Sequence, residues 1–353
     1  MRILQLNFER GWRGGERQTL LCMQQFREAG HDVALLARRK GALAKAATSD
    51  GFTVHEYQSV VGLCFFLLTQ GRGFDILHAQ TANTVTWLAL FKWWLRGALV
   101  FTRRTAFHVA EDRAKKTLWK WRKVDLFVAI SEAAAAEPRR LGLAVKVIRS
   151  AITAKVLDLA HARDFSARFG LQDKRVIATA AAMTREKDPC TLIRAIHDLK
   201  QMRDDFVFVH LGAGGDVEAE AHQLVKELGL EHHYIFAGFQ DNAEDLYRLM
   251  DVFVSSSREE ALGTSVLDAF LYSVPVVSTC AGGLAETLAD GRGLLCAVGD
   301  HQAMAQAIAN VLDDVELRES ILNKAHVYVS QEHDVVEMGR RYLVEFERLA
   351  GIK

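Results

Sequence analysis

The sequence predicts an α/β protein built from two doubly wound, Rossmann-like domains that face each other across a cleft. Three observations predict this fold class. Short apolar segments alternate with helical patterns, the alternation starts afresh after residue 170, and 353 residues suffice for two domains. Strands that alternate with helices form βαβ units around a parallel sheet. Ligands of such sheets bind outside the carboxyl ends of the strands, so we expect the functional residues there.

The first half of the chain is expected to form the first domain, residues 1–150. Its predicted strands are 3–7, 33–37, 76–79, 98–102, 126–130 and 145–148, and its clearest helical stretches are 16–29, 83–95 and 132–141. Each strand is short and apolar, which is typical of a parallel sheet that is buried on both faces.

The second half repeats the pattern, and we expect a second domain over residues 151–330. Its predicted strands are 176–180, 206–211, 234–237, 252–255, 275–278 and 293–295, and its predicted helices are 190–202, 217–228, 242–250 and 265–272. The tail from about 301 to 350 has three helix-like segments. We expect the last of them, 331–353, to pack back on the first domain.

The composition excludes several classes of protein. Half of the residues are hydrophobic and a quarter are charged, which excludes a disordered chain. The longest apolar run, residues 60–68, is too short to cross a bilayer, and the N-terminus lacks the features of a signal peptide. Five widely spaced cysteines without a C-x-x-C motif argue against a disulfide framework or structural zinc. We therefore expect a cytoplasmic protein.

The two halves differ in charge. Residues 1–150 hold 24 Lys and Arg against 12 Asp and Glu, and the rest of the chain carries the opposite excess. One interpretation is that the halves have different partners, and the other is that opposite charges help them dock.

A basic segment in the first half, residues 113–123, contains Trp119 and Trp121, and Trp93 and Trp94 lie upstream beside Lys92. Basic helices with tryptophan bind anionic membrane surfaces, whereas a solvated helix over core tryptophans would give the same pattern. Neither alternative is excluded. The segment matches no nucleic-acid motif, so we expect no nucleic-acid partner.

The strongest local signal lies between residues 255 and 275. An apolar strand runs into a polar turn, and a helix is predicted to begin near Thr264, directly after Gly263. A helix start offers free N–H groups and a positive dipole end to a phosphate, and Thr264 and Ser265 add hydroxyl donors. Glu260 and Asp268 flank this position, and carboxylates accept hydrogen bonds from sugar and ribose hydroxyls. The pattern therefore predicts a nucleotide-sugar site, with a simple capped helix as the alternative.

The residues downstream support the first interpretation. A strand with Pro275-Val276-Val277 and a turn with Gly282-Gly283 follow, and Glu286 completes a G-G-x-x-E pattern. The whole segment resembles the C-terminal signature of retaining glycosyltransferases of family 4, whose fold is GT-B. Their E-x7-E motif corresponds here to Glu260-x7-Asp268.

The resemblance extends over nearly the whole chain and implies further site residues. Gly15 and Glu16 fall in the first glycine-rich loop, which the resemblance places near the donor phosphates and the acceptor. His78 ends a strand similar to the family's D-V-V-H-A-H segment and would lie on the acceptor side. Arg103 and Arg104 form a T-R-R segment similar to that of a bacterial subgroup.

In the second half, Lys187 matches a lysine that holds the donor diphosphate in the family. The family's arginine is replaced by Ala182, and Arg185 is a candidate substitute. Gly212 lies in a V-G-x-G-like loop. Gly238 and Phe239 belong to an F-x-G-x loop that faces the nucleobase in the family.

The resemblance implies a retaining glycosyltransferase of the hexosyl- or heptosyltransferase type, which moves a sugar from a nucleotide-sugar donor to a glycan or glycolipid hydroxyl. Lipopolysaccharide or another cell-envelope polysaccharide is the expected product. The catalytic candidates are Glu260, Lys187 and Arg104. The sequence has no D-x-D motif, so we expect no metal and no other cofactor. The expected location is the cytoplasm, with a peripheral position on the inner face of the cytoplasmic membrane as a further option.

Two other functions stay open at this point. One is a sugar-nucleotide epimerase of similar fold, which would interconvert free sugar nucleotides. The other is a catalytically inactive scaffold at a membrane surface, because Ala182 and Arg104 depart from the family pattern.

Overall fold

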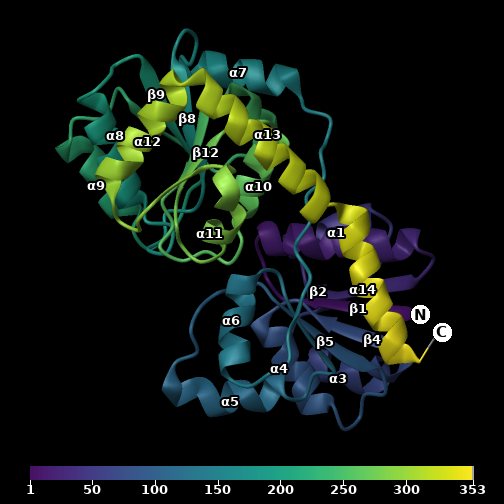
Figure 1. The fold of residues 1–353 in the computed structure, drawn as a ribbon. Helices are drawn as coiled ribbons and strands as arrows, with labels where there is room; N and C mark the ends of the chain where they lie inside the picture. The colour runs from purple at the N-terminus through teal and green to yellow at the C-terminus, as the bar shows by residue number, and fades with distance from the viewer. Residues whose placement is uncertain (352–353) are drawn as a thin grey trace. The chain divides into compact units, whose positions relative to one another are not determined.

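The computed structural model describes residues 1–351 (Figure 1). Contacts divide the chain into two compact units. Unit 1 contains Met1–Ala151 together with the segment from His333 onward, and unit 2 contains Ile152–Glu332. The last two residues of the expected 331–353 segment lie outside the described residues.

Unit 1 is built on a seven-stranded parallel sheet in the order β3-β2-β1-β4-β5-β6-β7. Its strands are β1 (Arg2–Asn7), β2 (Asp32–Arg38), β3 (Thr53–Tyr57), β4 (Ile76–Ala79), β5 (Ala98–Arg103), β6 (Leu126–Ala129) and β7 (Lys146–Val147). The six strands predicted for this half are confirmed. The prediction missed β3, an edge strand whose sequence TVHEY is largely polar and only partly buried.

Helices cover both faces of this sheet. They are α1 (Gly14–Glu28), α2 (Ala42–Ser49), α3 (Val60–Thr69), α4 (Ala82–Phe91), α5 (Glu111–Trp121), α6 (Glu132–Arg140) and α14 (Val335–Ala350), with the short 3-10 turn η1 (Gly71–Gly73). Figure 1 shows the C-terminal helix α14, in yellow, running beside α1. Phe26 of α1 packs against Tyr342 and Phe346 of α14, and all three side chains are buried in one core.

Unit 2 has a six-stranded parallel sheet in the order β10-β9-β8-β11-β12-β13. Its strands are β8 (Arg175–Ala180), β9 (Phe206–Leu211), β10 (Tyr234–Gly238), β11 (Val252–Ser255), β12 (Val276–Thr279) and β13 (Leu294–Cys296). All six were predicted from the sequence. Because every strand is parallel, the carboxyl ends of all six lie at the same edge of the sheet.

The helices of unit 2 are α7 (Leu159–Phe169), α8 (Pro189–Lys200), α9 (Glu218–Glu227), α10 (Thr264–Leu271), α11 (Gly283–Thr287), α12 (His301–Asp313) and α13 (Val315–Glu332). Two short 3-10 segments, η2 (Ala243–Leu249) and η3 (Ala289–Gly291), complete the unit. The predicted helix at 242–250 is therefore a 3-10 helix, and it follows Asn242 in the left-handed conformation.

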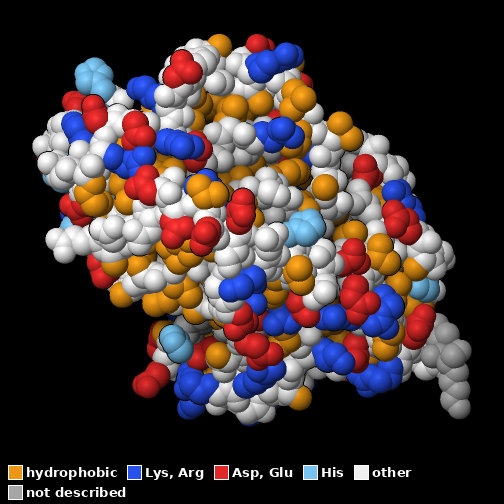
Figure 2. All heavy atoms as spheres, turned by 45° about the horizontal axis from the view of Figure 1, so that its top comes forward, with side chains coloured by type: hydrophobic (Ala, Val, Ile, Leu, Met, Phe, Trp, Pro, Cys, Tyr) orange, Lys and Arg blue, Asp and Glu red, His pale blue; other side chains and the backbone are white. Residues whose placement is uncertain are grey.

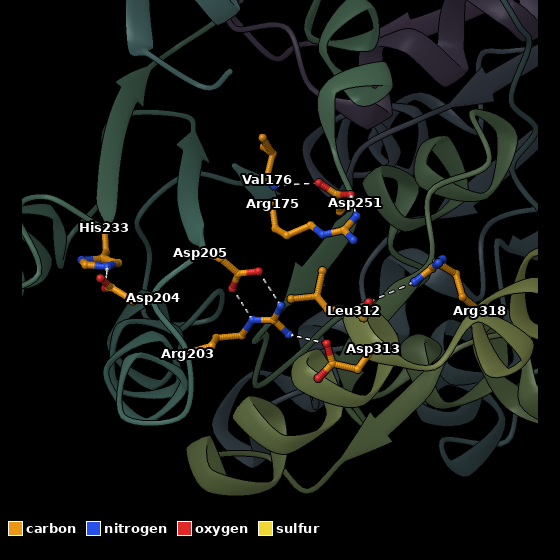
Figure 3. Close-up of polar contacts among 10 residues, drawn as sticks. All are labelled: Arg175, Val176, Arg203, Asp204, Asp205, His233, Asp251, Leu312, Asp313 and Arg318. Carbon is orange, nitrogen blue, oxygen red and sulfur yellow. Dashed lines mark hydrogen bonds and ion pairs between the residues drawn. The ribbon is translucent and has the colours of Figure 1, made fainter. Parts of the chain in front are cut away.

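The amino-end edge of this sheet is fixed by polar contacts (Figure 3). The Asp251 carboxylate, before β11, accepts hydrogen bonds from the Val176 amide at 2.8 Å and from Arg175 Nη1 at 3.1 Å. Arg203 Nε donates to Asp205 at 2.6 Å, and its Nη1 donates to Asp313 at 2.8 Å. These groups tie strands and helices to one another at the amino edge of the sheet.

In the described part of the chain, no helix is both long and apolar enough to cross a membrane. Figure 2 shows acidic, basic and apolar side chains interspersed on the face that it draws. On this face, therefore, the opposite net charges of the two halves do not appear as separate acidic and basic patches.

Candidate functional site

Lys187 and Glu260 form an ion pair at the carboxyl edge of the unit 2 sheet. Lys187 lies in the loop after β8 and Glu260 in the loop after β11, and Lys187 Nζ contacts Glu260 Oε2. Both side chains are partly exposed, at 29% and 18%. Glu260 Oε1 also accepts a hydrogen bond from the Ala261 amide at 3.2 Å. Two residues predicted separately from sequence motifs are therefore in contact.

A network around Asp188 fixes these two loops. The buried Asp188 carboxylate caps α8 by accepting from the Thr191 amide at 3.2 Å, and it also accepts from Arg258 Nε at 2.8 Å. Ser256 Oγ lies 2.9 Å from the carbonyl oxygens of both Lys187 and Asp188. The sequence analysis missed Asp188, Ser256 and Arg258. The Asp188-Pro189 pair, an N-cap followed by proline at the first helical position, is the signal that would have revealed Asp188.

Helix α10 begins at Thr264, as the sequence predicted. Gly263 precedes it with φ of +84°, and a Cβ there would lie 2.6 Å from Leu284 Cδ2. Thr264 and Ser265 are partly exposed, whereas Asp268 is buried. Only glycine fits this turn without strain, and it keeps the helix start free of a side chain that would hinder an approaching anion.

The loops after β9 and β10 also meet. The Gly212 amide donates to the Gly238 carbonyl at 2.8 Å, and a Cβ on Gly212 would lie 2.0 Å from the Ala181 carbonyl oxygen. Phe239, which follows directly, is 63% exposed. An exposed aromatic ring beside a glycine turn is suited to stacking on a planar ligand group.

Arg185 lines an open cavity near the Lys187–Glu260 ion pair. Its Nε contacts the Asp216 carboxylate at 3.1 Å, and its amide donates to the same carboxylate at 3.0 Å. The cavity has a volume of about 480 Å³ and is lined by Thr184, Arg185, Glu186, Asp216, Arg258 and Glu259. Arg185 is therefore close to the loop of Lys187, but it is already paired with an acid.

In unit 1, Gly15 and Arg104 are neighbours at the carboxyl edge of the sheet. A Cβ on Gly15, the second residue of α1, would lie 3.7 Å from Arg104 Cδ. Arg104 Nη2 donates to Gln80 Oε1 at 2.7 Å, and Nη1 donates to Ser150 Oγ at 3.1 Å. Neutral partners thus hold the guanidinium beside the first loop without neutralising its charge.

Glu16 holds the loop between β1 and α1 in place. Its carboxylate is buried and accepts hydrogen bonds from Asn7 Nδ2 at 3.1 Å and from the Arg13 amide at 3.0 Å. These contacts fix the start of α1, so the observed role of Glu16 is to position the loop.

His78 lies inside unit 1. Its ring is fully buried on β4, where Gln5 Nε2 lies 3.1 Å from Nδ1 and Thr102 Oγ1 lies 2.7 Å from Nε2. Burial, aided by the charge of Arg104, lowers the pKa of His78 to about 3. A histidine in this state is neutral near pH 7, and we leave it out of the reaction site.

Arg103 also turns inward. Nη1 donates to the Ala134 carbonyl at 2.8 Å, Nη2 donates to the Phe107 carbonyl, and the guanidinium lies 5.5 Å from the centre of the Trp121 ring. Burial lowers the pKa of Arg103. Its contacts join β5, the following loop and α6, so of the T-R-R pair we carry only Arg104 forward.

Within residues 1–351, no three His, Cys, Asp or Glu side chains come together in an arrangement that could hold a metal ion.

Two family models match consecutive parts of the chain. Residues 12–155 match the model described as Glycosyltransferase Family 4, and residues 163–327 match Glycosyl transferases group 1. The chain belongs to glycosyltransferase family 4. The two matched ranges follow the division into unit 1 and unit 2, so each family 4 domain corresponds to one sheet.

Curated relatives of this family 4 protein include two named glycosyltransferases. A lipopolysaccharide core biosynthesis glycosyltransferase, LpsE of Rhizobium meliloti, is 32% identical over 155 residues, 44% of either chain. A 2-deoxystreptamine glucosyltransferase of Streptomyces kanamyceticus is 30% identical over 52% of this chain and 49% of its own. The chain thus matches about half or less of the length of these relatives.

Solved structures confirm the GT-B fold predicted from the sequence. Anabaena HepE, crystallised in complex with UDP-glucose, superposes with a TM-score of 0.87 at 21% identity and covers 99% of this chain and 100% of its own. A glycosyltransferase from Rickettsia africae gives a TM-score of 0.84 at 20% identity and covers 99% and 98%.

Proposed function

We propose that this family 4 protein transfers a sugar from a nucleotide sugar to a hydroxyl of a glycan or glycolipid, with retention of configuration and without a metal. The observation that carries the proposal is the pair Lys187–Glu260, held near the start of α10 at one edge of the unit 2 sheet. The printed names of two relatives support the substrate classes. HepE was crystallised with UDP-glucose, and LpsE acts in lipopolysaccharide core biosynthesis.

The Lys187–Glu260 ion pair can separate when a donor binds, so that each side chain contacts the donor. A diphosphate carries more negative charge than one carboxylate, so it competes with Glu260 for the Lys187 ammonium group. The released Glu260 then accepts hydrogen bonds from hydroxyls of the donor sugar. The free amides at the start of α10 bind a second face of the diphosphate.

The reaction proposed is the one that the resemblance to family 4 implies. The bond between the anomeric carbon and the diphosphate oxygen breaks, and the acceptor oxygen bonds to the anomeric carbon on the same face. The acceptor proton passes to the departing diphosphate oxygen, so no strongly basic side chain is required. Lys187 and the α10 amides stabilise the charge that develops on the leaving group.

Other residues have supporting roles in this proposal. Asp268 accepts from the ribose hydroxyls, and Phe239 stacks on the nucleobase. In unit 1, Arg104 beside Gly15 stays a candidate for contact with an anionic group of a substrate. Arg185 is available if the diphosphate displaces Asp216 from it.

Product analysis tests the proposal. The purified chain is incubated with UDP-glucose and dephosphorylated or intact core oligosaccharides, with and without EDTA. We expect an α-linked product, identified by its anomeric proton coupling, and an unchanged rate in EDTA. A β-linked product or a loss of activity in EDTA would contradict retention or metal independence. Interconversion of the sugar nucleotide without an acceptor would indicate an epimerase, and no consumption of any sugar nucleotide would indicate a scaffold.

The acceptor is proposed to be presented at an anionic membrane surface. Exposed apolar side chains gather on the helices α3, α4 and α5 and just after α4. Among them Val61 and Trp93 are each 77% exposed, Phe65 is 66% exposed, and Trp119 is 43% exposed. Trp94 Nε1 donates to the Leu68 carbonyl at 2.9 Å, which joins the ends of α3 and α4.

Cations lie on helix α5, beside the exposed Trp119. Lys120 Nζ donates to the Ala82 carbonyl at 3.1 Å and so ties α5 to α4, while Lys115 and Lys116 lie exposed on α5. The two tryptophans of the basic segment differ in exposure: Trp121 is buried in the core, and Trp119 is exposed. Exposed aromatic and basic side chains together favour an anionic bilayer interface.

Vesicle sedimentation tests this part of the proposal. We expect the chain to pellet with phosphatidylglycerol vesicles more than with phosphatidylcholine vesicles, and Phe65→Ser with Trp93→Ser to abolish the difference. Leu159→Ser in unit 2, which alters another exposed apolar residue (53% exposed), is the control. Equal pelleting with both lipids would refute a role for the membrane.

A further inference from the structure

A second cavity lies in unit 1, and none of the residues assigned above lines it. It has a volume of about 440 Å³ and is formed where β2 and β3 end and where the chain leaves β1. Its lining consists of Arg10, Arg38, Arg39, Lys40, Gly41, Tyr57 and Gln58. Four of these seven residues are cations and none is acidic.

Within residues 1–351, the four cations of this cavity do not form ion pairs with carboxylates. Arg39 Nη1 donates to the neutral Gln58 Oε1 at 2.7 Å. The nearby Glu56 carboxylate is engaged by the backbone, because it accepts from the Lys40 amide at 3.2 Å. Like charges gathered at a partly enclosed surface repel each other unless an anion binds among them.

The backbone that presents Lys40 is strained. Lys40 has φ of +61°, a left-handed conformation that side chains other than glycine rarely adopt. The Gly41 amide donates to the Arg38 carbonyl at 3.1 Å, and the Ala42 amide donates to the Arg10 carbonyl at 3.2 Å, so the turn is fixed against the loop after β1. Strained residues of this kind cluster at ligand sites, where the surrounding structure maintains them.

The cavity also adjoins the first loop of the proposed reaction site. β1 and β2 are paired neighbours with Asn7 opposite Ala37, so their carboxyl ends emerge side by side. The loop after β1 contributes Arg10 to the cavity and leads on to Gly15 at the start of α1. A molecule held in the cavity therefore lies at the same edge of the sheet as Gly15 and Arg104.

We propose that this cavity binds an anionic group, a phosphate or a carboxylate, on a sugar of the acceptor glycan. The inference rests on the proposed transferase function and specifies its acceptor. Arginine forks match the paired oxygens of both groups, and Lys40 adds a point charge. The Tyr57 hydroxyl and the Gln58 amide offer neutral hydrogen bonds to the sugar that carries the group.

Calorimetric titration of the full chain tests the proposal without any turnover. The probes are glucose 6-phosphate, glucuronate, glucose and glycerol 3-phosphate, the last standing for a lipid headgroup. We expect one or both anionic sugars to bind at least tenfold more tightly than glucose, and the tighter one identifies the group. If glucose binds as tightly as glucose 6-phosphate and glucuronate do, the cavity does not recognise an anionic group and the proposal is wrong. If glycerol 3-phosphate binds as tightly as glucose 6-phosphate, the cavity does not recognise the sugar and the assignment to a glycan is wrong.

Variants locate the binding. Arg10→Gln and Lys40→Asn should each weaken binding of the anionic sugar about tenfold, the effect of losing one hydrogen bond to a charged group. Asparagine tolerates the left-handed conformation, so Lys40→Asn should keep the melting temperature of the parent. Lys45→Gln removes an equally exposed lysine from α2, outside the cavity lining, and should change nothing. Unchanged affinity in Lys40→Asn would overturn the proposal.

UDP is titrated into the same samples to separate this inference from the proposed function. The cavity variants should bind UDP as the parent does, whereas Lys187→Ala should lose UDP and keep the anionic sugar. If the parent chain does not bind UDP, the proposed function is refuted. The sugar titrations would still show whether the cavity binds an anionic sugar. Loss of UDP in the cavity variants would assign the cavity to the donor and refute the acceptor assignment.

Discussion

Lys187 and Glu260 each satisfy the charge of the other in a partly exposed position. Exposed ion pairs of this kind stabilise a fold by only about 0–1 kcal/mol. Separation of the pair by an incoming diphosphate therefore costs little, and a half-buried position strengthens the new contact to phosphate. The pair is better explained as a binding device than as a source of stability.

This assignment predicts a large effect on catalysis and a small one on folding. Lys187→Ala and Glu260→Gln should each lower kcat by about 10²–10³-fold, because each removes a preorganised contact worth about 2.7–4 kcal/mol in the transition state. Steady-state kinetics with UDP-glucose measures the loss, and a melting curve shows whether the fold persists. Lys174→Ala, an exposed lysine before β8, is the matched control. Full activity in either site variant would refute the assignment.

At some of the residues predicted from sequence motifs, several signals coincided. Lys187, Glu260 and Gly263 belong to segments in which a strand end, a polar turn and a helix start all agree, and the structure brings Lys187 and Glu260 into contact. His78 and Arg103 also stand at strand ends, but they are buried and hydrogen-bonded inside unit 1. Which way a side chain turns at a strand end depends on tertiary packing that the local sequence does not contain.

At the scale of elements, one buried carboxylate orders the loop that follows β5. Glu137 of α6 accepts hydrogen bonds from the Val109 amide at 2.9 Å and from Arg140 Nη2 at 2.7 Å, and it lies 3.0 Å from His108 Nδ1. The Arg140 hydrogen bonds, with those of Val109 and His108, lower the pKa of Glu137 to about 2. This loop begins directly after Arg104, so its order bears on the proposed site.

The lowered pKa predicts how stability depends on pH. A depressed pKa in the folded state stabilises the fold above the unfolded pKa near 4.5 and loses that contribution as pH falls toward 2. Glu137→Gln should therefore destabilise unit 1 by about 1–3 kcal/mol at pH 7, and the difference from the parent should shrink between pH 4.5 and pH 2. Melting temperatures at a series of pH values measure it.

Glu111→Gln, an exposed carboxylate on α5, is the control for this series. A difference between parent and Glu137→Gln that stays constant down to pH 2 would show that the charge of Glu137 does not stabilise the fold.

Short apolar segments between polar turns were predicted as strands, whereas an apolar helix was missed. All six strands of unit 2 are continuous apolar segments and were found. Helix α3 has no polar face, because its sequence VVGLCFFLLT is apolar throughout, and the sequence analysis treated it only as an apolar run. Its exposed Val61 and Phe65 show why hydrophobic periodicity fails there: part of the apolar surface faces outward.

At the scale of the whole molecule, unit 1 is discontinuous in sequence. The chain leaves it at Ala151, forms unit 2, and returns at His333 to add α14. Met338, Tyr342 and Phe346 of α14 are buried in the same core as Phe26 of α1. The return helix is therefore part of the hydrophobic core of unit 1, and unit 1 depends on the far end of the chain for its stability.

This dependence predicts a local effect of a distant substitution. Phe346→Ala should destabilise unit 1 by about 3–5 kcal/mol, because it leaves a cavity in a fully buried core. Hydrogen exchange should accelerate in β1 and β2 but not in β8 and β9. Val344→Ala, on the exposed side of the same helix, should leave both units unchanged. Equal acceleration in the two sheets would contradict the division into units.

The most direct test of the account is a crystal structure of the chain with UDP-glucose. We expect diphosphate oxygens to lie about 2.7–3.2 Å from Lys187 Nζ and from amides of the first turn of α10, with Glu260 separated from Lys187 and hydrogen-bonded to sugar hydroxyls. A diphosphate bound elsewhere, with the Lys187–Glu260 pair intact, would contradict the account.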